Sequence, residues 1–184
     1  VIYVLNGNLD FANNIDSGIL PPDVNRWVTT ALYACCIIGF AKNGVMPFHN
    51  WLPSAMVAPT PVRALLHAVA VVKAGAFGIV RIVYEVYGVE FAQSLDLLYP
   101  LAIFAAVTIL WGSFRALFQD DLKKRLAYST VSQVSYIVLG VALFGPIGTI
   151  GGLVHLVHQG IMKITLFFCA GNYAETLGIH KVSE

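Results

Sequence analysis

Long, almost uninterrupted apolar stretches recur along the whole chain, and they constrain its fold more than any other feature. Five of them are Trp27–Ala41, Val62–Tyr84, Leu97–Phe118, Leu126–Phe144 and Gly148–Ala170. Most approach the ~20 residues that a helix needs to cross a ~30 Å hydrocarbon core. Only helices and closed barrels satisfy their backbone in lipid, and barrel strands would alternate over ~10 residues. The sequence therefore predicts an all-α, polytopic bundle of transmembrane helices.

The composition agrees with a membrane environment for these stretches. Apolar residues make up 58% of the chain and charged residues 11%, against about 45–50% and about 25% in average soluble domains. The formal net charge is only +1, which argues against a nucleic-acid partner. We therefore expect an integral membrane protein in contact with the lipid bilayer.

The stretches fit a single membrane domain over residues 1–184. We expect about five full spans, preceded by the end of an earlier one at Val1–Leu5. The first full span starts near Val24 and continues to Trp51 with a break near Pro47, since proline lacks a backbone N–H. The chain has neither an initiator Met nor a charged region ahead of an apolar core, so we expect a piece of a longer protein without a signal peptide.

Polar segments separate the later stretches. Gly88–Asp96 predicts a loop, "QDDLKKR" at 119–125 predicts a tight charged turn, and "FGPIGTIGG" at 144–152 predicts the next turn. Arg115 and the lysines of the charged turn place that turn in the cytoplasm by the positive-inside rule. Alternation of the spans then puts the C-terminus on the same side.

Lys42 lies within the first long stretch, close to Pro47 and Pro53. Each proline deprives a carbonyl one turn earlier of its helical partner. Such backbone at membrane depth is tolerated only inside protein or beside water, and broken helices of this kind form ion sites in transporters. The alternative is that Lys42 ends a short helix and extends to the headgroups.

His67 and Lys73 lie on the second stretch. An ionisable residue at the centre of a span costs ~2.5–3.5 kcal/mol or more, which favours a functional role. Apolar residues flank Lys73 on both sides, so its amino group does not easily reach an interface. The two side chains point about 120° apart on a helix. A neutral, buried His67 could equally be structural.

The last stretch carries a polar stripe. His155, Gln159 and Lys163 are spaced four residues apart, with His158 and Met162 beside them. Residues at this spacing share one helix face, and histidine titrates near neutral pH. The stripe is compatible with a proton relay or with interhelical hydrogen bonds that hold a bundle together.

The fourth stretch also carries polar residues on adjoining faces. These are Ser129, Ser132, Gln133 and Tyr136. We interpret them mainly as helix-packing groups, although hydroxyls also hold ordered water.

Enzymatic signatures are missing from the sequence. It has no Gly-rich phosphate loop and no nucleophile elbow. Cys35, Cys36 and Cys169 form no CxxC pair and lie in apolar stretches, so we interpret them as small packing residues. We expect no catalytic residue, metal site, cofactor or redox centre in this chain.

Two long motifs resemble one family. "KNGVMPFHNWLPSAMVAPTPVRALLHA" and "FRALFQDDLKKRLAYSTVSQVSY" are similar to the signatures of the antiporter-like membrane subunits. These subunits occur in respiratory complex I, in multisubunit cation/proton antiporters and in membrane-bound hydrogenases. The resemblance covers roughly residues 37–172.

The resemblance implies a fold of two inverted helical repeats with a central line of buried lysines and histidines. Residues 24–87 would then end the first repeat and residues 97–173 would start the second. By the same resemblance, the matching proton-relay residues in this chain are Lys42, His67, Lys73, His155 and Lys163.

One position departs from the family pattern. Many members carry a histidine four residues before the central lysine, where this chain has Gln159 and places a histidine at 158 instead. A relay that passes directly through residue 159 is therefore in doubt, and His158 would have to substitute from a neighbouring angle.

The resemblance predicts proton translocation within a larger redox-driven or cation/proton antiport complex. That complex would be of the NADH:quinone oxidoreductase, hydrogenase or antiporter type. The expected partners are other membrane subunits, the transported ions are protons or sodium, and the location is a bacterial or archaeal cytoplasmic membrane. One alternative is a structural or assembly subunit whose polar groups only hold helices together. A solute transporter is the third option, and no residues suited to an organic solute stand out.

Overall fold

The computed structural model describes residues 18–20, 25–40, 70–143 and 145–183. This part of the chain is helical, and within it the only β-type pairing is an isolated bridge between Asp121 and Lys181. The helices are α2 (Arg26–Gly39), α5 (Val71–Arg81), α6 (Val89–Ser94), α7 (Leu98–Leu117), α8 (Leu122–Ala142) and α9 (Pro146–Thr176). A π-helical turn, Ile82–Tyr87, continues α5. The predicted all-α fold is thus confirmed for the described residues.

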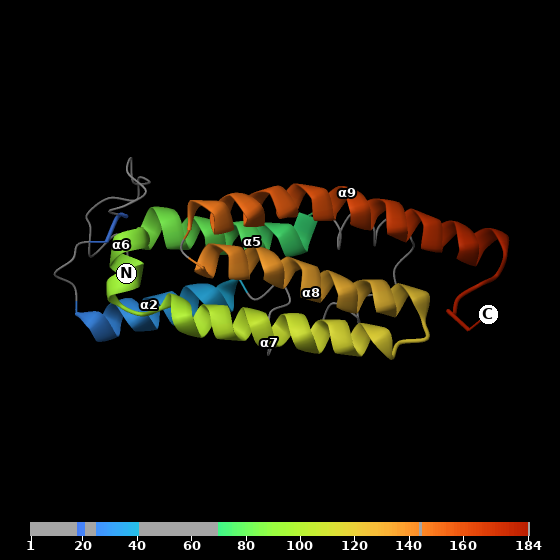
Figure 1. Cartoon of the computed structure of the whole chain (residues 1–184), viewed down its shortest axis with the longest axis horizontal. Helices are drawn as coiled ribbons and strands as arrows, with labels where there is room; N and C mark the ends of the chain where they lie inside the picture. Colours follow the sequence, from blue (N-terminus) through green and yellow to red (C-terminus); the bar gives the residue numbers. More distant parts are fainter. Residues whose placement is uncertain (1–17, 21–24, 41–69, 144, 184) are drawn as a thin grey trace.

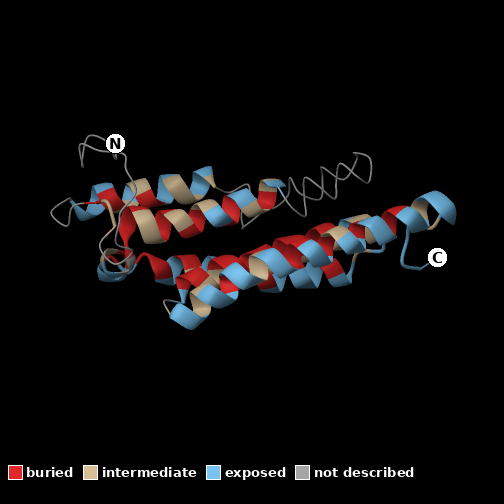
Figure 2. Cartoon of the chain, turned by 90° about the horizontal axis from the view of Figure 1, so that it is seen from above, coloured by how far each residue is buried: buried red, intermediate tan, exposed pale blue. Residues whose placement is uncertain are grey.

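The long helices form an elongated bundle with α8 at its centre. Figure 1 shows α7, α8 and α9 side by side along the long axis, with α2 and α5 beside one half of them. α8 packs against α7, α9 and α5. Buried residues lie on the helix sides that face one another, and the outer sides are exposed (Figure 2).

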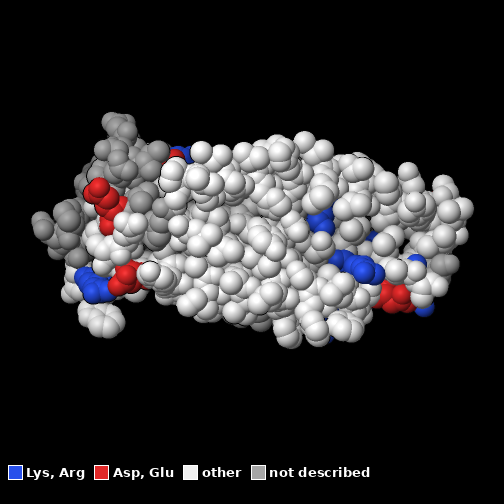
Figure 3. Space-filling view, in the orientation of Figure 1, with Lys and Arg blue, Asp and Glu red and all other residues white. Residues whose placement is uncertain are grey.

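Two of the described helices, α7 and α9, are long and apolar enough to cross a membrane. Their outward faces are unusually apolar: Ile103, Leu110, Phe114, Ile150, Val157 and Ile161 are all exposed. Figure 3 shows charged side chains gathered toward the two ends of the visible face, with a broad uncharged band between them. This distribution suits a bundle surrounded by lipid, where polar groups are placed at the ends or inside.

Three predicted connections are wrong in part. α9 begins at Pro146, so most of the predicted turn at 144–152 is helical. α8 begins at Leu122 rather than after the charged turn, because the Asp121 carboxylate caps it by accepting the backbone N–H groups of Lys123 (3.0 Å) and Lys124 (3.1 Å). The predicted loop at Gly88–Asp96 contains the short helix α6. The predicted break at Pro47 and the full number of spans fall outside the described residues.

Glycines set the close approach of α8 and α9 at one end of their interface. A Cβ added to Gly140 would lie 2.7 Å from the carbonyl oxygen of Gly148, and one added to Gly152 would lie 3.1 Å from the carbonyl oxygen of Ile137. No side chain fits at Gly140 without moving backbone. We call Gly140, Gly148 and Gly152 the glycine seam.

A short segment after α9 returns to the start of α8. The N–H of Leu122 donates to the His180 carbonyl (3.1 Å), and the N–H of Val182 donates to the Asp120 carbonyl (2.8 Å). The Asp120 carboxylate also accepts the backbone N–H (3.1 Å) and the hydroxyl (2.9 Å) of Ser183. Gly178 permits this reversal with a φ of +69°. We call residues 179–183 the C-terminal strap.

Candidate functional site

Lys163 is the most deeply buried charged residue among those described. It lies near the middle of α9 and is 1% exposed. Its amino group donates to the hydroxyl oxygen of Ser129 at 2.7 Å and approaches the carbonyl oxygen of Leu126 at 3.5 Å. Both acceptors belong to α8. The lysine therefore points into the α8–α9 interface and not toward the ends of the bundle.

The antiparallel packing of α8 and α9 brings the rest of the polar stripe to the same interface. The rings of His155 and Tyr136 meet edge to face with their centres 6.1 Å apart. Beyond Lys163, Phe167 is buried against Ala127. Gln159 lies between His155 and Lys163 on the same face of α9, and it is 1% exposed. His155, Gln159 and Lys163 therefore form one row along the interface, as their spacing predicted.

The row contains polar atoms that no group in the described part of the chain satisfies. Both amide atoms of Gln159 and Nε2 of His155 are buried and have no hydrogen-bond partner among the described residues. The hydroxyl of Tyr33 shares this property, at a distant place on α2. Buried polar atoms in proteins are nearly always bonded to protein or to ordered water. Among the described residues, the Gln159 amide and Nε2 of His155 are therefore the buried polar atoms of the row that lack a partner.

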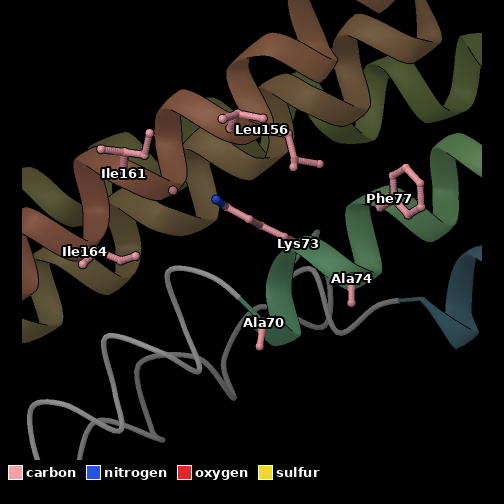
Figure 4. Close-up of a pocket in the computed structure, with 9 residues that line it drawn as sticks. Ala70, Lys73, Ala74, Phe77, Leu156, Ile161 and Ile164 are labelled. Carbon is pink, nitrogen blue, oxygen red and sulfur yellow. The ribbon is translucent and has the colours of Figure 1, made fainter.

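Lys73 approaches α9 from the other side. Figure 4 shows its side chain extending from α5 toward α9 in the region of Leu156 and Ile161. It lines an open, mostly apolar pocket of about 500 Å³ whose walls come from α5 and α9. Gly160, the residue after Gln159 in the sequence, is part of the same pocket. The charge of Lys73 is close enough to act electrostatically on His155. A half-buried lysine on α5 thus faces the helix that carries the buried Lys163.

The remaining predicted site residues are less centrally placed. His158 and Met162 are exposed and do not join the row. Ser132 is buried and its hydroxyl is 2.8 Å from that of Ser113 on α7, so it connects α8 to α7 rather than to α9. Gln133 is half-buried, and Tyr136 is 45% exposed although its ring contacts His155. Lys42, His67, Pro47 and Pro53 lie outside the described residues.

Sequence reasoning missed the specific partner of Lys163. It treated Ser129 as a packing group, and it did not single out Ser113 at all. The available signal was the short connection between α8 and α9. It predicts an antiparallel pair, in which residues early in one helix lie beside residues late in the other. The spacing of apolar residues alone does not give the register of such a pair.

Metal ligands do not gather in the described part of the chain, where no group of three or more His, Cys, Asp or Glu residues is close enough to hold an ion. Cys35, Cys36 and Cys169 are free thiols, and Cys35 and Cys169 are exposed. His155 and Lys163 each carry a nitrogen atom that can gain or lose a proton.

Comparison with known proteins decides the family. Residues 1–181 match the family model described as "NADH:quinone oxidoreductase/Mrp antiporter, TM". The chain belongs to this family. It is therefore an antiporter-like chain of the integral membrane type, in agreement with the resemblance of its two motifs.

Relatives of different kinds are similar over most of the chain. It is 36% identical to NADH-quinone oxidoreductase subunit N of Desulforudis audaxviator over 186 aligned residues, which cover 100% of this chain and 36% of that protein. It is 37% identical to a probable K(+)/H(+) antiporter protein of Rhizobium meliloti, covering 77% of this chain and 14% of that protein. The chain thus spans about a third or less of these relatives.

Two solved structures share the fold. The Mrp complex from Dietzia sp. matches with a TM-score of 0.75 and 30% identity, over 85% of this chain and 17% of that one. An archaeal respiratory membrane complex, the membrane-bound sulfane sulfur reductase, matches with a TM-score of 0.80 and 27% identity, over 99% of this chain and 37% of that one. Both of these relatives are parts of membrane complexes.

Proposed function

We propose that this chain contributes a proton-transfer path to an antiporter-like subunit of a larger membrane complex. That complex either couples redox chemistry to proton translocation or exchanges cations for protons. Protons pass between Lys42, the helix of His67 and Lys73, and the row His155–Gln159–Lys163, with water between the side chains. Changes in the protonation of the lysines control the transfer.

The burial of Lys163 carries this proposal. A lysine held at the middle of a membrane helix costs several kcal/mol, so lysines in such positions are rare and usually have a function. Lys163 does not relieve that cost by extending to headgroups, because its amino group is bonded inside the bundle to Ser129. A chain whose polar groups only hold helices together would not require a cation there, since neutral side chains form interhelical hydrogen bonds equally well.

The placement of Lys73 supports a path that crosses between helices. Its side chain points across the α5–α9 pocket toward the helix that carries the row. α5 belongs to residues 24–87, which we propose to be the end of a first helical repeat, and α9 belongs to residues 97–173, the start of a second. A proton path between the two would therefore link the repeats.

The setting of the path is also a proposal. We place the protein in a bacterial or archaeal cytoplasmic membrane, beside other membrane subunits, with protons as the transported ion and sodium as the alternative. The family includes relatives described as Na(+)/H(+) and K(+)/H(+) antiporter subunits.

Lys163→Ala and Lys42→Ala in the intact complex test the proposal. Proton transport in sealed vesicles should fall at least tenfold in each variant, because each removes one proton-accepting nitrogen from the path. Lys124→Ala is the matched control, since Lys124 is exposed at the start of α8, and it should leave the rate within twofold. Full transport in both of the first two variants, with the complex assembled, would show that the chain is a structural subunit.

A further inference from the structure

We propose that Gln159 is a positioning residue that holds the water through which protons pass between Lys163 and His155. The inference rests on the proposed function and names the group that replaces the family's histidine in this chain. Sequence reasoning offered His158 for that role. In the structure His158 is exposed, whereas Gln159 lies in the row and is 1% exposed.

Distance makes an intermediary necessary. His155 and Lys163 are eight residues apart on one helix, which corresponds to about 12 Å along the axis at 1.5 Å per residue. Proton transfer requires hydrogen-bond contact, so the two nitrogens do not exchange a proton directly. Gln159 is four residues from each of them and faces the same neighbour, α8. It is the only side chain of the row between them.

The amide has the right groups to hold water but not to carry the proton. A glutamine offers one acceptor oxygen and two N–H donors, and it stays neutral at physiological pH. Oε1 and Nε2 of Gln159 and Nε2 of His155 are all buried, and none of them has a partner within the ranges that the structure describes. Two to four such partners are what a buried water molecule needs. The same side chains provide them at the place where a bridge is required.

Lys163 and Ser129 complete the chain of hydrogen bonds. The ammonium has three N–H groups, and Ser129 and Leu126 accept two of them. The third N–H is available to donate a proton to water. That water passes a proton onward, and His155 Nε2 accepts one at the far end. The step leaves a neutral amine and an imidazolium, and the Gln159 amide is unchanged by it.

The test compares two replacements of Gln159 in the intact complex. Gln159→Met keeps the length of the side chain but removes both hydrogen-bonding groups, and proton transport in sealed vesicles should fall at least tenfold. Gln159→His restores a polar group of similar reach, and transport should stay within threefold of wild type. Thr165→Val, which removes a hydroxyl from an exposed position of the same helix, is the matched control and should have no effect.

A structural role predicts a different pattern. Wild-type transport in Gln159→Met, or an equal loss in Gln159→Met and Gln159→His, would overturn the inference while Lys163→Ala still abolished transport. Full transport in Lys163→Ala would overturn the proposed function itself. A cryo-electron microscopy map of the wild-type complex decides the question even if a variant does not assemble. It should show water density within hydrogen-bond distance of the Gln159 amide, and an amide bonded only to protein groups would contradict the inference.

Discussion

The Lys163–Ser129 contact is suited to a lysine that gains and loses a proton. A hydroxyl can accept a hydrogen bond from an ammonium group, and it can donate one to a neutral amine. The contact at 2.7 Å therefore survives in both states of Lys163. The described residues form no ion pair with Lys163 that would hold it in the charged state. Neutral partners thus keep the amino group in place without fixing its charge.

Ser129→Ala should lower proton transport about tenfold, with the complex still assembled. The substitution removes the nearer acceptor of Lys163 and leaves only the Leu126 carbonyl at 3.5 Å. A hydrogen bond to a charged group contributes about 1.5–3 kcal/mol. Transport in vesicles measures the effect. Ser113→Ala removes a hydroxyl that bonds Ser132 on the other side of α8, and it should change transport less than twofold. Equal effects of the two variants would mean that general packing, and not the lysine contact, is being measured.

At the scale of the helices, α7, α8 and α9 show which features of the fold the sequence predicts and which it does not. The apolar stretches predicted α7 and α9 closely, because length and hydropathy alone specify a membrane helix. The predicted start of α8 was wrong, because the charged residues at 119–125 were interpreted as a turn. Asp121 instead caps a helix that includes Lys123, Lys124 and Arg125. Spacing correctly placed His155, Gln159 and Lys163 on one face. It could not identify Ser129 as their partner, since that depends on how far one helix is shifted along the other.

Gly140→Ala should destabilise the α8–α9 pair by about 1–3 kcal/mol, the usual cost of overpacking. The new methyl group would lie 2.7 Å from the backbone oxygen of Gly148, so the helices would have to separate. Thermal unfolding of the detergent-solubilised protein measures the loss as a lower Tm.

Gly151→Ala is the matched control for the glycine seam. It lies on the same helix as Gly148, and a Cβ there has no neighbour within 4 Å. Because alanine favours a helix over glycine by about 1 kcal/mol, its Tm should stay the same or rise. A lower Tm in Gly151→Ala than in Gly140→Ala would contradict the role of the seam.

Across the described part of the molecule, apolar side chains both fill the core and cover the outside. Large apolar side chains cover the outside of α7 and α9, while the hydroxyls of Thr130, Ser132 and Ser135 are buried on α8. Thr130 and Ser135 bond to carbonyls one turn earlier in their own helix. A few buried hydroxyls and Lys163 thus lie within a mostly apolar core. Charges remain at the ends, where the C-terminal strap ties α9 to the beginning of α8.

Asp120→Ala should release the C-terminal strap without affecting the row. The substitution removes the acceptor of both the N–H and the hydroxyl of Ser183. Hydrogen exchange at the amides of Leu122 and Val182 should become faster, since these amides bond across the strap. Exchange near Gln159 should not change. Glu175→Gln, an exposed position near the end of α9, should leave all of these amides as they are, and unchanged exchange in Asp120→Ala would show that the strap is held by other groups.

The C-terminal strap and the glycine seam attach α9 to α8 near both of its ends. The seam joins its beginning to the end of α8, and the strap joins its end to the beginning of α8. Because both ends are attached, α9 does not slide easily along α8. We therefore expect a displacement at Lys163, between the two attachments, to occur by bending of the helix. We expect such bending to leave both attachments intact, so that the amino group keeps the same hydroxyl as its nearest partner.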